Sequence, residues 1–184
     1  PRQIVRDAVK FNAQGKVKEK YNPYFVSGSS GGYSIPDSSV GKTGFEYDCL
    51  GRTAVVTNPD LTYRSVQYSD WVETKTDENG HQVRSTYDAF NRLVQKDEFN
   101  QGEIYTTKYS YNIYEIEYYD SSYVHRKAFK ITDAKNNVTS ITYDLADRKL
   151  KMIDPDMGTW YYTYDKAGNL KTQKDAKAQT ITFT

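Results

Sequence analysis

Few residues of this chain have the type and spacing that catalysis requires. The stretch "GSSGG" at 28–32 has the letters of a hydrolase nucleophile elbow around Ser30. That elbow needs a strand before the serine and a helix after it. Here "YSIPDSS" follows, whose proline and lack of helical periodicity predict a flexible loop. An enzyme hypothesis would depend on Ser30 alone.

Metal-ligating residues are equally sparse. His81 and His125 are the only histidines, and neither has the spacing to Cys49 that a zinc site requires. We expect the two histidines to be solvated residues and Cys49 to be a turn residue. The single cysteine also excludes an intramolecular disulfide. The sequence therefore predicts no catalytic residue, no metal site and no cofactor.

The charge balance argues against two classes of partner. The 184 residues carry 25 basic and 24 acidic side chains, for a formal charge of +1. This balance gives no electrostatic reason to expect nucleic acid or an anionic membrane as a partner. No apolar run reaches the roughly 18 residues of a membrane span. Hydrophobic residues make up 37% of the chain, and 18 residues are tyrosine, so rings with a polar tip replace much of an aliphatic core.

The residues that do recur are those that form turns. Five stretches have an aromatic residue, then Asp or Asn, then a residue that tolerates positive φ three places later: "FNAQGK" at 11, "YDCLGR" at 47, "YDAFNR" at 87, "YDLADR" at 143 and "YDKAGN" at 164. Asp or Asn is favoured at the first position of a type I turn. A hairpin whose type I turn is closed by a bulge also needs a residue with a left-handed backbone at the end of the turn. The predicted left-handed residues are Gly15, Gly51, Asn91, Asp147 and Gly168.

A second turn series alternates with the first, at "NPDL" (58), "DENG" (77), "DAKN" (133), "DPDMG" (154) and "DAKA" (175). The segments between turns have about six to eight residues and are rich in Thr, Tyr, Val and Ile, which is typical of strands. In "GTWYYTYD" the two-residue period places Trp160, Tyr162 and Tyr164 on one face. Few strands have the strongly apolar face that a β-sandwich needs. The pattern favours a long sheet wetted on both sides.

Two segments interrupt the rhythm. Residues 21–44 are rich in Ser, Gly and Pro, which predicts a loop inserted between repeats. Residues 109–133 have strand composition but lack the Gly-like turn residue, so we interpret them as a degenerate repeat or an elongated hairpin. We treat residues 1–184 as one repeat segment of a larger protein, with repeats near 11, 47, 87, 143 and 164.

The stretches "YDCLGRTAVVTNPD", "TYDAFNRLVQ" and "DPDMGTWYYTYDKAGNLKTQKDAKAQTITF" resemble the tyrosine-aspartate (YD) repeat of rearrangement hotspot (RHS) proteins. This group includes bacterial polymorphic toxins, the B and C components of insecticidal toxin complexes, and animal teneurins. The resemblance implies a ribbon of β-hairpins that spirals into a hollow shell, which in the toxins encloses a toxin polypeptide. Asn91, Asp147 and Ala178 depart from the family's turn glycine.

These observations predict an all-β fold of antiparallel hairpin repeats in a curved, spiralling sheet, with a structural and non-enzymatic function. The resemblance implies as partners other RHS repeats of the same parent chain and an encapsulated toxin polypeptide, in a secreted or cell-surface bacterial protein. The alternative is a carbohydrate-binding or adhesive module that contacts sugars through Trp160 and Tyr162. The residues predicted to form the turns and to pack beside them are Tyr47, Asp48, Gly51, Tyr87, Asp88, Asn91, Tyr143, Asp144, Asp147, Tyr164, Asp165 and Gly168.

Overall fold

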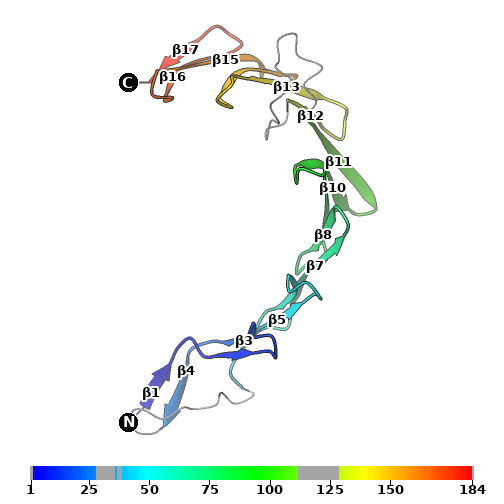
Figure 1. The fold of residues 1–184 in the computed structure, drawn as a ribbon, viewed down its shortest axis with the longest axis vertical. Helices are drawn as coiled ribbons and strands as arrows, with labels where there is room; N and C mark the ends of the chain where they lie inside the picture. The colour runs from blue at the N-terminus through cyan, green and yellow to red at the C-terminus, as the bar shows by residue number, and fades with distance from the viewer. Residues whose placement is uncertain (1, 28–35, 37–38, 112–128, 184) are drawn as a thin grey trace. The chain divides into compact units, whose positions relative to one another are not determined.

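The computed structural model describes residues 2–27, 36, 39–111 and 129–183 (Figure 1). Within these residues the chain consists of β-strands joined by turns, and it contains no helix, hence none that could cross a membrane. The strand pairs among these residues are antiparallel. The prediction of an all-β fold built from antiparallel hairpins is confirmed. The chain divides into two compact units, residues 1–83 and 84–184, which are described separately.

The first unit is a row of short strands, most of which pair with the next strand in sequence. Its strands are β1 (Arg2–Val5), β2 (Val9–Phe11), β3 (Val17–Tyr21), β4 (Tyr24–Ser27), β5 (Lys42–Tyr47), β6 (Thr53–Thr57), β7 (Tyr63–Ser69) and β8 (Val72–Thr76). The hydrogen-bonded order is β2-β3-β5-β6-β7-β8, and β1 pairs with β4 in a separate two-stranded sheet. The strand β9 (Gln82–Tyr87) spans the boundary between the units.

Part of the segment expected to be an inserted loop is strand. Residues 24–27 form β4 and pair with β1, and β5 begins at Lys42. The run Tyr24-Phe25-Val26 explains the difference, because aromatic and β-branched residues favour an extended backbone. Of the expected degenerate repeat at 109–133, residues 112–128 lie outside the described residues.

The second unit continues the same plan. Its strands are β10 (Leu93–Asn100), β11 (Glu103–Ser110), β12 (Lys130–Thr132), β13 (Val138–Tyr143), β14 (Lys149–Asp154), β15 (Gly158–Tyr164), β16 (Leu170–Lys174) and β17 (Thr180–Thr182), each paired with its sequence neighbour. The register shifts by one residue at Thr142/Tyr143 and at Thr163/Tyr164. Each shift immediately precedes a Tyr-Asp turn, where a bulged hairpin places its extra residue.

The faces of the second unit differ in burial. In β15, Trp160, Tyr162 and Tyr164 are half-buried, whereas Tyr161 and Thr163 on the opposite face are exposed. The register places Met152 opposite Trp160, and Ile141 opposite Met152. The more apolar face therefore carries the tyrosines of the Tyr-Asp pairs, and we call it the tyrosine face.

Neither unit has a conventional apolar core among its described residues. Tyr21 and Val56 are the buried hydrophobic side chains of the first unit, and Phe129 is that of the second. The most deeply buried side chain is a carboxylate, Asp97, at 1% exposure. Since so little apolar surface is removed from water, the hydrophobic effect contributes less here than in a globular domain, and hydrogen bonds and ring contacts must contribute more.

Candidate functional site

The YD loops, residues 12–16, 48–52, 88–92, 144–148 and 165–169, share one hydrogen-bond pattern. In each loop the backbone N–H of the first residue donates to the carbonyl of the fifth, and the N–H of the fourth donates to the carbonyl of the first. The side chain of the first residue also accepts from the backbone: Oδ1 of Asp48 accepts from Leu50 N at 3.0 Å and Arg52 N at 2.8 Å. Asn12, Asp88 and Asp144 accept from the same two positions, and Asp165 accepts from Asn169 N.

The fourth residue of every YD loop has a left-handed backbone. The φ angles are +76° at Gly15, +78° at Gly51, +58° at Asn91, +58° at Asp147 and +89° at Gly168. Asn and Asp adopt this conformation at a modest cost because their short polar side chains bond locally. At Gly51 there is a second constraint, because Lys16 donates from Nζ to the Gly51 carbonyl and a Cβ there would lie 2.9 Å from Lys16 Cε.

The loops of the second series at 58–62, 77–81, 133–137 and 175–179 have the same backbone pattern. Their fourth residues are also left-handed, and only one is glycine: Leu61 at +72°, Gly80 at +84°, Asn136 at +64° and Ala178 at +64°. The loop at 154–158 differs, because its left-handed residue is the fifth, Gly158 at +73°. The two turn series are therefore largely one motif. In each unit the loops of the two series lie at opposite ends of the strands.

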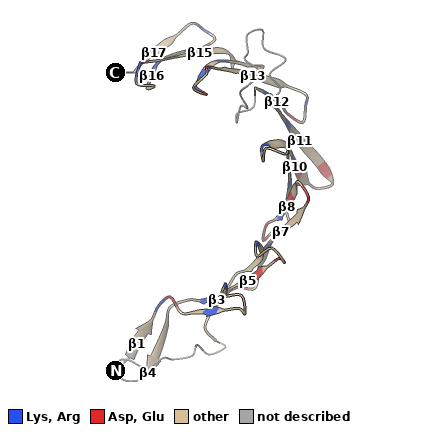
Figure 2. Ribbon diagram, viewed as in Figure 1, with Lys and Arg blue, Asp and Glu red and all other residues tan. Residues whose placement is uncertain are grey.

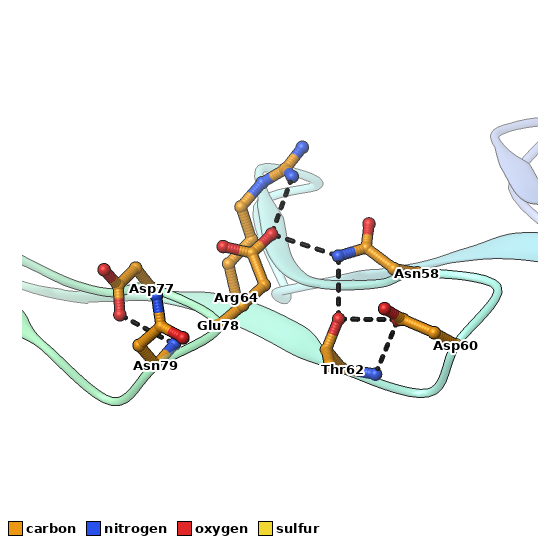
Figure 3. Close-up of polar contacts among 7 residues, drawn as sticks. All are labelled: Asn58, Asp60, Thr62, Arg64, Asp77, Glu78 and Asn79. Atoms are coloured by element: carbon orange, nitrogen blue, oxygen red, sulfur yellow. Dashed lines mark hydrogen bonds and ion pairs between the residues drawn. The ribbon is translucent and has the colours of Figure 1, made fainter.

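Side chains connect neighbouring loops of the first unit. Asn58 donates from Nδ2 to Thr62 Oγ1 and to Glu78 Oε1, each at 3.1 Å, and Arg64 reaches the same Glu78 oxygen at 3.3 Å (Figure 3). Asp60 caps the loop in place of its first residue, accepting from Thr62 N at 3.0 Å (Figure 3). Glu78 therefore ties the turn at 77–81 to the turn at 58–62.

The tyrosines make a contact that joins one repeat to the preceding one. Tyr47 donates from its hydroxyl to the Val17 carbonyl at 2.8 Å. Tyr164 donates in the same way to the Lys149 carbonyl at 3.0 Å, and Tyr111 to the Leu93 carbonyl at 2.9 Å. In all three cases the acceptor is the residue that follows the preceding YD loop. We call this hydrogen bond the tyrosine lock.

A cationic side chain covers the ring of each locked tyrosine. The fifth residue of the preceding YD loop supplies it: Lys16 lies 5.1 Å from the Tyr47 ring centre, Arg92 lies 4.6 Å from that of Tyr111, and Arg148 lies 5.0 Å from that of Tyr164. Both arginines also pair with the first residue of their own loop, Arg92 with Asp88 at 2.7 Å and Arg148 with Asp144 at 2.6 Å. At these two arginines, the lock therefore combines a capped turn, an ion pair and a cation–π contact.

The local electrostatics favour the charged carboxylates. Partial desolvation acts to raise the pKa of Asp144, but the backbone N–H and guanidinium of Arg148 outweigh it, so the pKa lies below its ordinary value. The pKa of Asp88 is lowered in the same way, against desolvation, by the Arg92 guanidinium and N–H. Burial raises the pKa of Tyr164, which keeps its hydroxyl protonated as a donor.

A buried carboxylate connects the first strands of the second unit. Asp97 in β10 accepts from Arg84 at 2.9 Å, from Gln95 at 2.9 Å and from Thr106 Oγ1 at 2.7 Å. These partners come from β9, β10 and β11. Desolvation acts to raise the pKa of Asp97, but the hydrogen bonds from Thr106, Gln95 and Arg84 hold it below its ordinary value. The cluster fixes three strands to one another without an apolar core.

The other sequence candidates are dispersed. Tyr87 is half-buried at the end of β9, and Tyr143 contacts Phe129 edge to face at 5.8 Å. His81 lies exposed in a turn with Nδ1 3.0 Å from Asp77 Oδ2, and Cys49 is exposed. Ser30 and His125 lie outside the described residues. No group of three or more His, Cys, Asp or Glu side chains within the described ranges could hold a metal ion.

The two residues proposed to contact sugars are half-buried on the tyrosine face. Trp160 donates from Nε1 to the Met157 carbonyl at 3.1 Å, and Lys149 Nζ lies 4.4 Å from the Tyr162 ring centre. Both rings therefore already contact the protein, whereas Tyr161 is the exposed ring of this strand, with 46% of its surface accessible.

Sequence reasoning missed the cationic residue of the lock and the buried cluster. The signal for the first was present, since Lys16, Arg92 and Arg148 all occupy the fifth position of their loops. Asp97 stands among strand residues in "LVQKDEFN", and a charge at such a position is indistinguishable from a solvated one until its neighbours are known. The role of Tyr111 could not be predicted from the sequence, because Asn112 and the residues after it lack the turn pattern.

Comparison with known proteins adds evidence on the fold. No protein-family model matches the chain, and no curated protein matches it in sequence. The crystal structure of TcdB2–TccC3–Cdc42 is similar over 98% of this chain and 10% of that chain, with a TM-score of 0.72 and 16% identity. The Tc holotoxin pore of Photorhabdus luminescens, with a TccC3 mutation, is similar over the same shares with a TM-score of 0.73 and 16% identity.

A crystal structure of TcdB2–TccC3 matches 97% of this chain and 11% of that one, with a TM-score of 0.51 and 16% identity. The chain thus spans about a tenth of the length of the structures that it matches. Those structures are Tc toxin complexes built from RHS/YD-repeat proteins. The chain therefore has the fold of the RHS/YD-repeat proteins of Tc toxin complexes, as its Tyr-Asp turns indicate.

Proposed function

We propose that this chain is a structural, non-enzymatic segment of a hairpin-repeat wall, part of a larger secreted or surface-exposed bacterial protein that encloses or presents a toxin polypeptide. The observation that carries the proposal is the tyrosine lock, which recurs at Tyr47, Tyr111 and Tyr164 with the same donor group, the same acceptor position and a covering cation from the same loop position. A contact repeated at constant geometry extends a surface, whereas a catalytic site is built once.

The sparse burial supports the same function. A sheet that is wetted on both faces can separate two compartments, because neither face has to be covered by a second layer of the same protein. The likeness to structures of Tc toxin complexes supports the choice of a toxin as the enclosed polypeptide. The hydrogen-bonded wall leaves both faces available to line a cavity or to face solvent.

The test is limited proteolysis of the full-length protein that contains this segment. If the repeats enclose a polypeptide, trypsin should leave that polypeptide intact until the wall is opened. A triple substitution of the lock tyrosines, Tyr47→Ala, Tyr111→Ala and Tyr164→Ala, should expose it to cleavage. The matched control is Tyr162→Phe, which removes a hydroxyl that makes no hydrogen bond among the described residues.

Equal trypsin sensitivity of the enclosed polypeptide in the parent and in the triple variant would contradict the proposal. So would electron micrographs in which particles of the full-length protein show no interior space. A hollow particle whose interior becomes accessible only in the triple variant is the expected result.

A further inference from the structure

Among the described residues of the second unit, the accessible strand carboxylates lie on one of its two faces. The face opposite the tyrosine face carries Lys108, Lys130, Lys151 and Lys174, and we call it the lysine face. None of the four has an ion pair among the described residues. The strand carboxylates Glu98, Glu103 and Asp154 fall on the tyrosine face by the alternation of side chains. Figure 2 colours the Lys and Arg residues blue and the Asp and Glu residues red along the ribbon.

Within the part of the unit that the structure describes, one strand carboxylate does lie on the lysine face, and its charge is already compensated. Asp97 is 1% exposed and is held by Arg84, Gln95 and Thr106. Most other polar side chains of the face are hydroxyls, among them Ser140, Thr142, Thr159, Thr163 and Thr172. The accessible charge of the face is therefore positive.

A single row across the sheet places two of the lysines on either side of an exposed ring. The register aligns Thr142 with Lys151, Lys151 with Tyr161, and Tyr161 with Lys174. Tyr161 is 46% exposed, and Lys151 Nζ lies 5.7 Å from its ring centre. Because neighbouring strands are 4.7–4.9 Å apart, the backbones of Lys151 and Lys174 are separated by about 9.5 Å.

The face is hollowed at its other end. Gln95, Thr106, Lys108 and Thr132 line a depression of about 430 Å³. Asp133 borders it, but that carboxylate is engaged in its own turn, accepting from Lys135 N, Asn137 N and Asn137 Nδ2 at 2.8 Å. The depression therefore has one cation, Lys108, and one carboxylate, Asp133, which is held in its own turn. Lys130 lies between the depression and the row.

We propose that the lysine face of the second unit binds an acidic, extended stretch of polypeptide. An unfolded chain frequently adopts the polyproline II conformation, which has three residues per turn and rises 3.1 Å per residue. Carboxylates at every third residue then lie on one side, roughly 9.3 Å apart, close to the separation of Lys151 and Lys174. A residue between two such carboxylates would stack on Tyr161.

This inference rests on the proposed function, because it assigns the lysine face to the enclosed polypeptide. The number of exposed rings favours a polypeptide over single-stranded nucleic acid, which binds by stacking successive bases on several rings. On the lysine face of β13 to β16, Tyr161 is the aromatic side chain that the register provides. One ring between two cations can stack on a single residue of an acidic chain while the cations pair with the carboxylates on either side of that residue.

The test measures binding of a fluorescent peptide that repeats Glu-Pro-Ala to the 184-residue chain, by fluorescence anisotropy at low salt. Lys151→Gln and Lys174→Gln should each weaken binding about threefold, and together about tenfold, because exposed ion pairs are individually weak. Added salt should weaken binding further. The control Lys166→Gln removes the same charge from the exposed tip of the loop 165–169 and should leave the affinity unchanged.

A second peptide of identical composition, with its glutamates in one block, tests the spacing and should bind more weakly. Absence of binding, equal binding of both peptides, or an equal effect of Lys166→Gln and Lys151→Gln would overturn the inference. Tighter binding of an oligonucleotide or a sulfated glycan with the same lysine dependence would also overturn it, in favour of another anionic polymer.

The two proposals fail in distinguishable ways. If the peptide does not bind but the full-length protein still shields its enclosed polypeptide from trypsin, the wall stands and the lysine face has no role in binding the polypeptide. If the peptide binds but no polypeptide is shielded, the lysine face is a peptide site on a protein that does not enclose its partner.

Discussion

The tyrosine lock at Tyr164 gives the sharpest prediction of stability. Tyr164→Phe removes the hydroxyl that donates to the Lys149 carbonyl at 3.0 Å, while it keeps the ring that Arg148 covers at 5.0 Å. A net protein hydrogen bond contributes about 0.5–1.5 kcal/mol, and water can partly replace the donor at this half-buried site, so we expect a loss of roughly 1 kcal/mol. The melting temperature should fall by about 2–4 °C for a chain of this size.

Hydrogen exchange locates the effect within the array. In repeat structures each repeat contacts mainly its neighbouring repeats, so the unfolding events that allow hydrogen exchange are local. Tyr164→Phe should reduce the protection of amides in β14 and β15 about fivefold and leave β10 and β11 unchanged. Tyr162→Phe, on the same strand and face, removes a hydroxyl without a hydrogen bond among the described residues and should leave both regions unchanged. Equal losses in the two variants, or no loss at Tyr164, would refute the lock as a source of stability.

Three further perturbations test the turns, the buried carboxylate and the charges. Gly51→Val should lower the free energy of unfolding in a urea titration by about 1–3 kcal/mol, because valine is strained at φ +78° and its Cβ would meet Lys16. The control Gly44→Val should lower the free energy of unfolding by less in the same titration. Asp97→Asn should lower the free energy of unfolding, measured by thermal unfolding, by roughly 2–4 kcal/mol, because it places an amide donor among the donors of a buried cluster. Glu98→Gln, which removes a charge from an exposed ion pair, should lower it by less than about 1 kcal/mol. The Lys42 ammonium and the Tyr21 hydroxyl lower the pKa of Glu19 to about 2, below its ordinary value of 4.5, so its stabilising contribution is full above pH 4.5 and disappears as the pH falls toward 2. The melting temperature should depend less on pH across that range in Glu19→Gln, and an identical pH dependence would contradict this assignment.

Turn chemistry could be predicted from the sequence because it is local. The side chain of Asp48 and the backbone of Gly51 act within five consecutive residues, so type and spacing alone indicate the loop. Leu61 shows the limit of that reasoning. Its φ of +72° is imposed by the loop around it, and a leucine gives no sign of a left-handed backbone.

The contacts between repeats could not be predicted in the same way. The bond from Tyr164 to the Lys149 carbonyl joins β15 to β14, and each of the two residues lies beside a bulge in the pairing with its other neighbouring strand. The burial of Asp97 depends on Arg84 and Thr106, which lie on other strands. The pairing of β1 with β4 depends on the path of the chain between them. Each of these is a property of neighbours in space, which a single sequence does not specify.

Calorimetry distinguishes a protein held together by capped turns and tyrosine locks from one held by a thick apolar core. The heat capacity of unfolding follows the apolar surface that becomes exposed, so it reports on the core itself. A globular chain of this length would give about 2.2–2.8 kcal/mol/K. We predict a value clearly below that range for this protein, and a value within or above it would contradict the role given to the turns and locks.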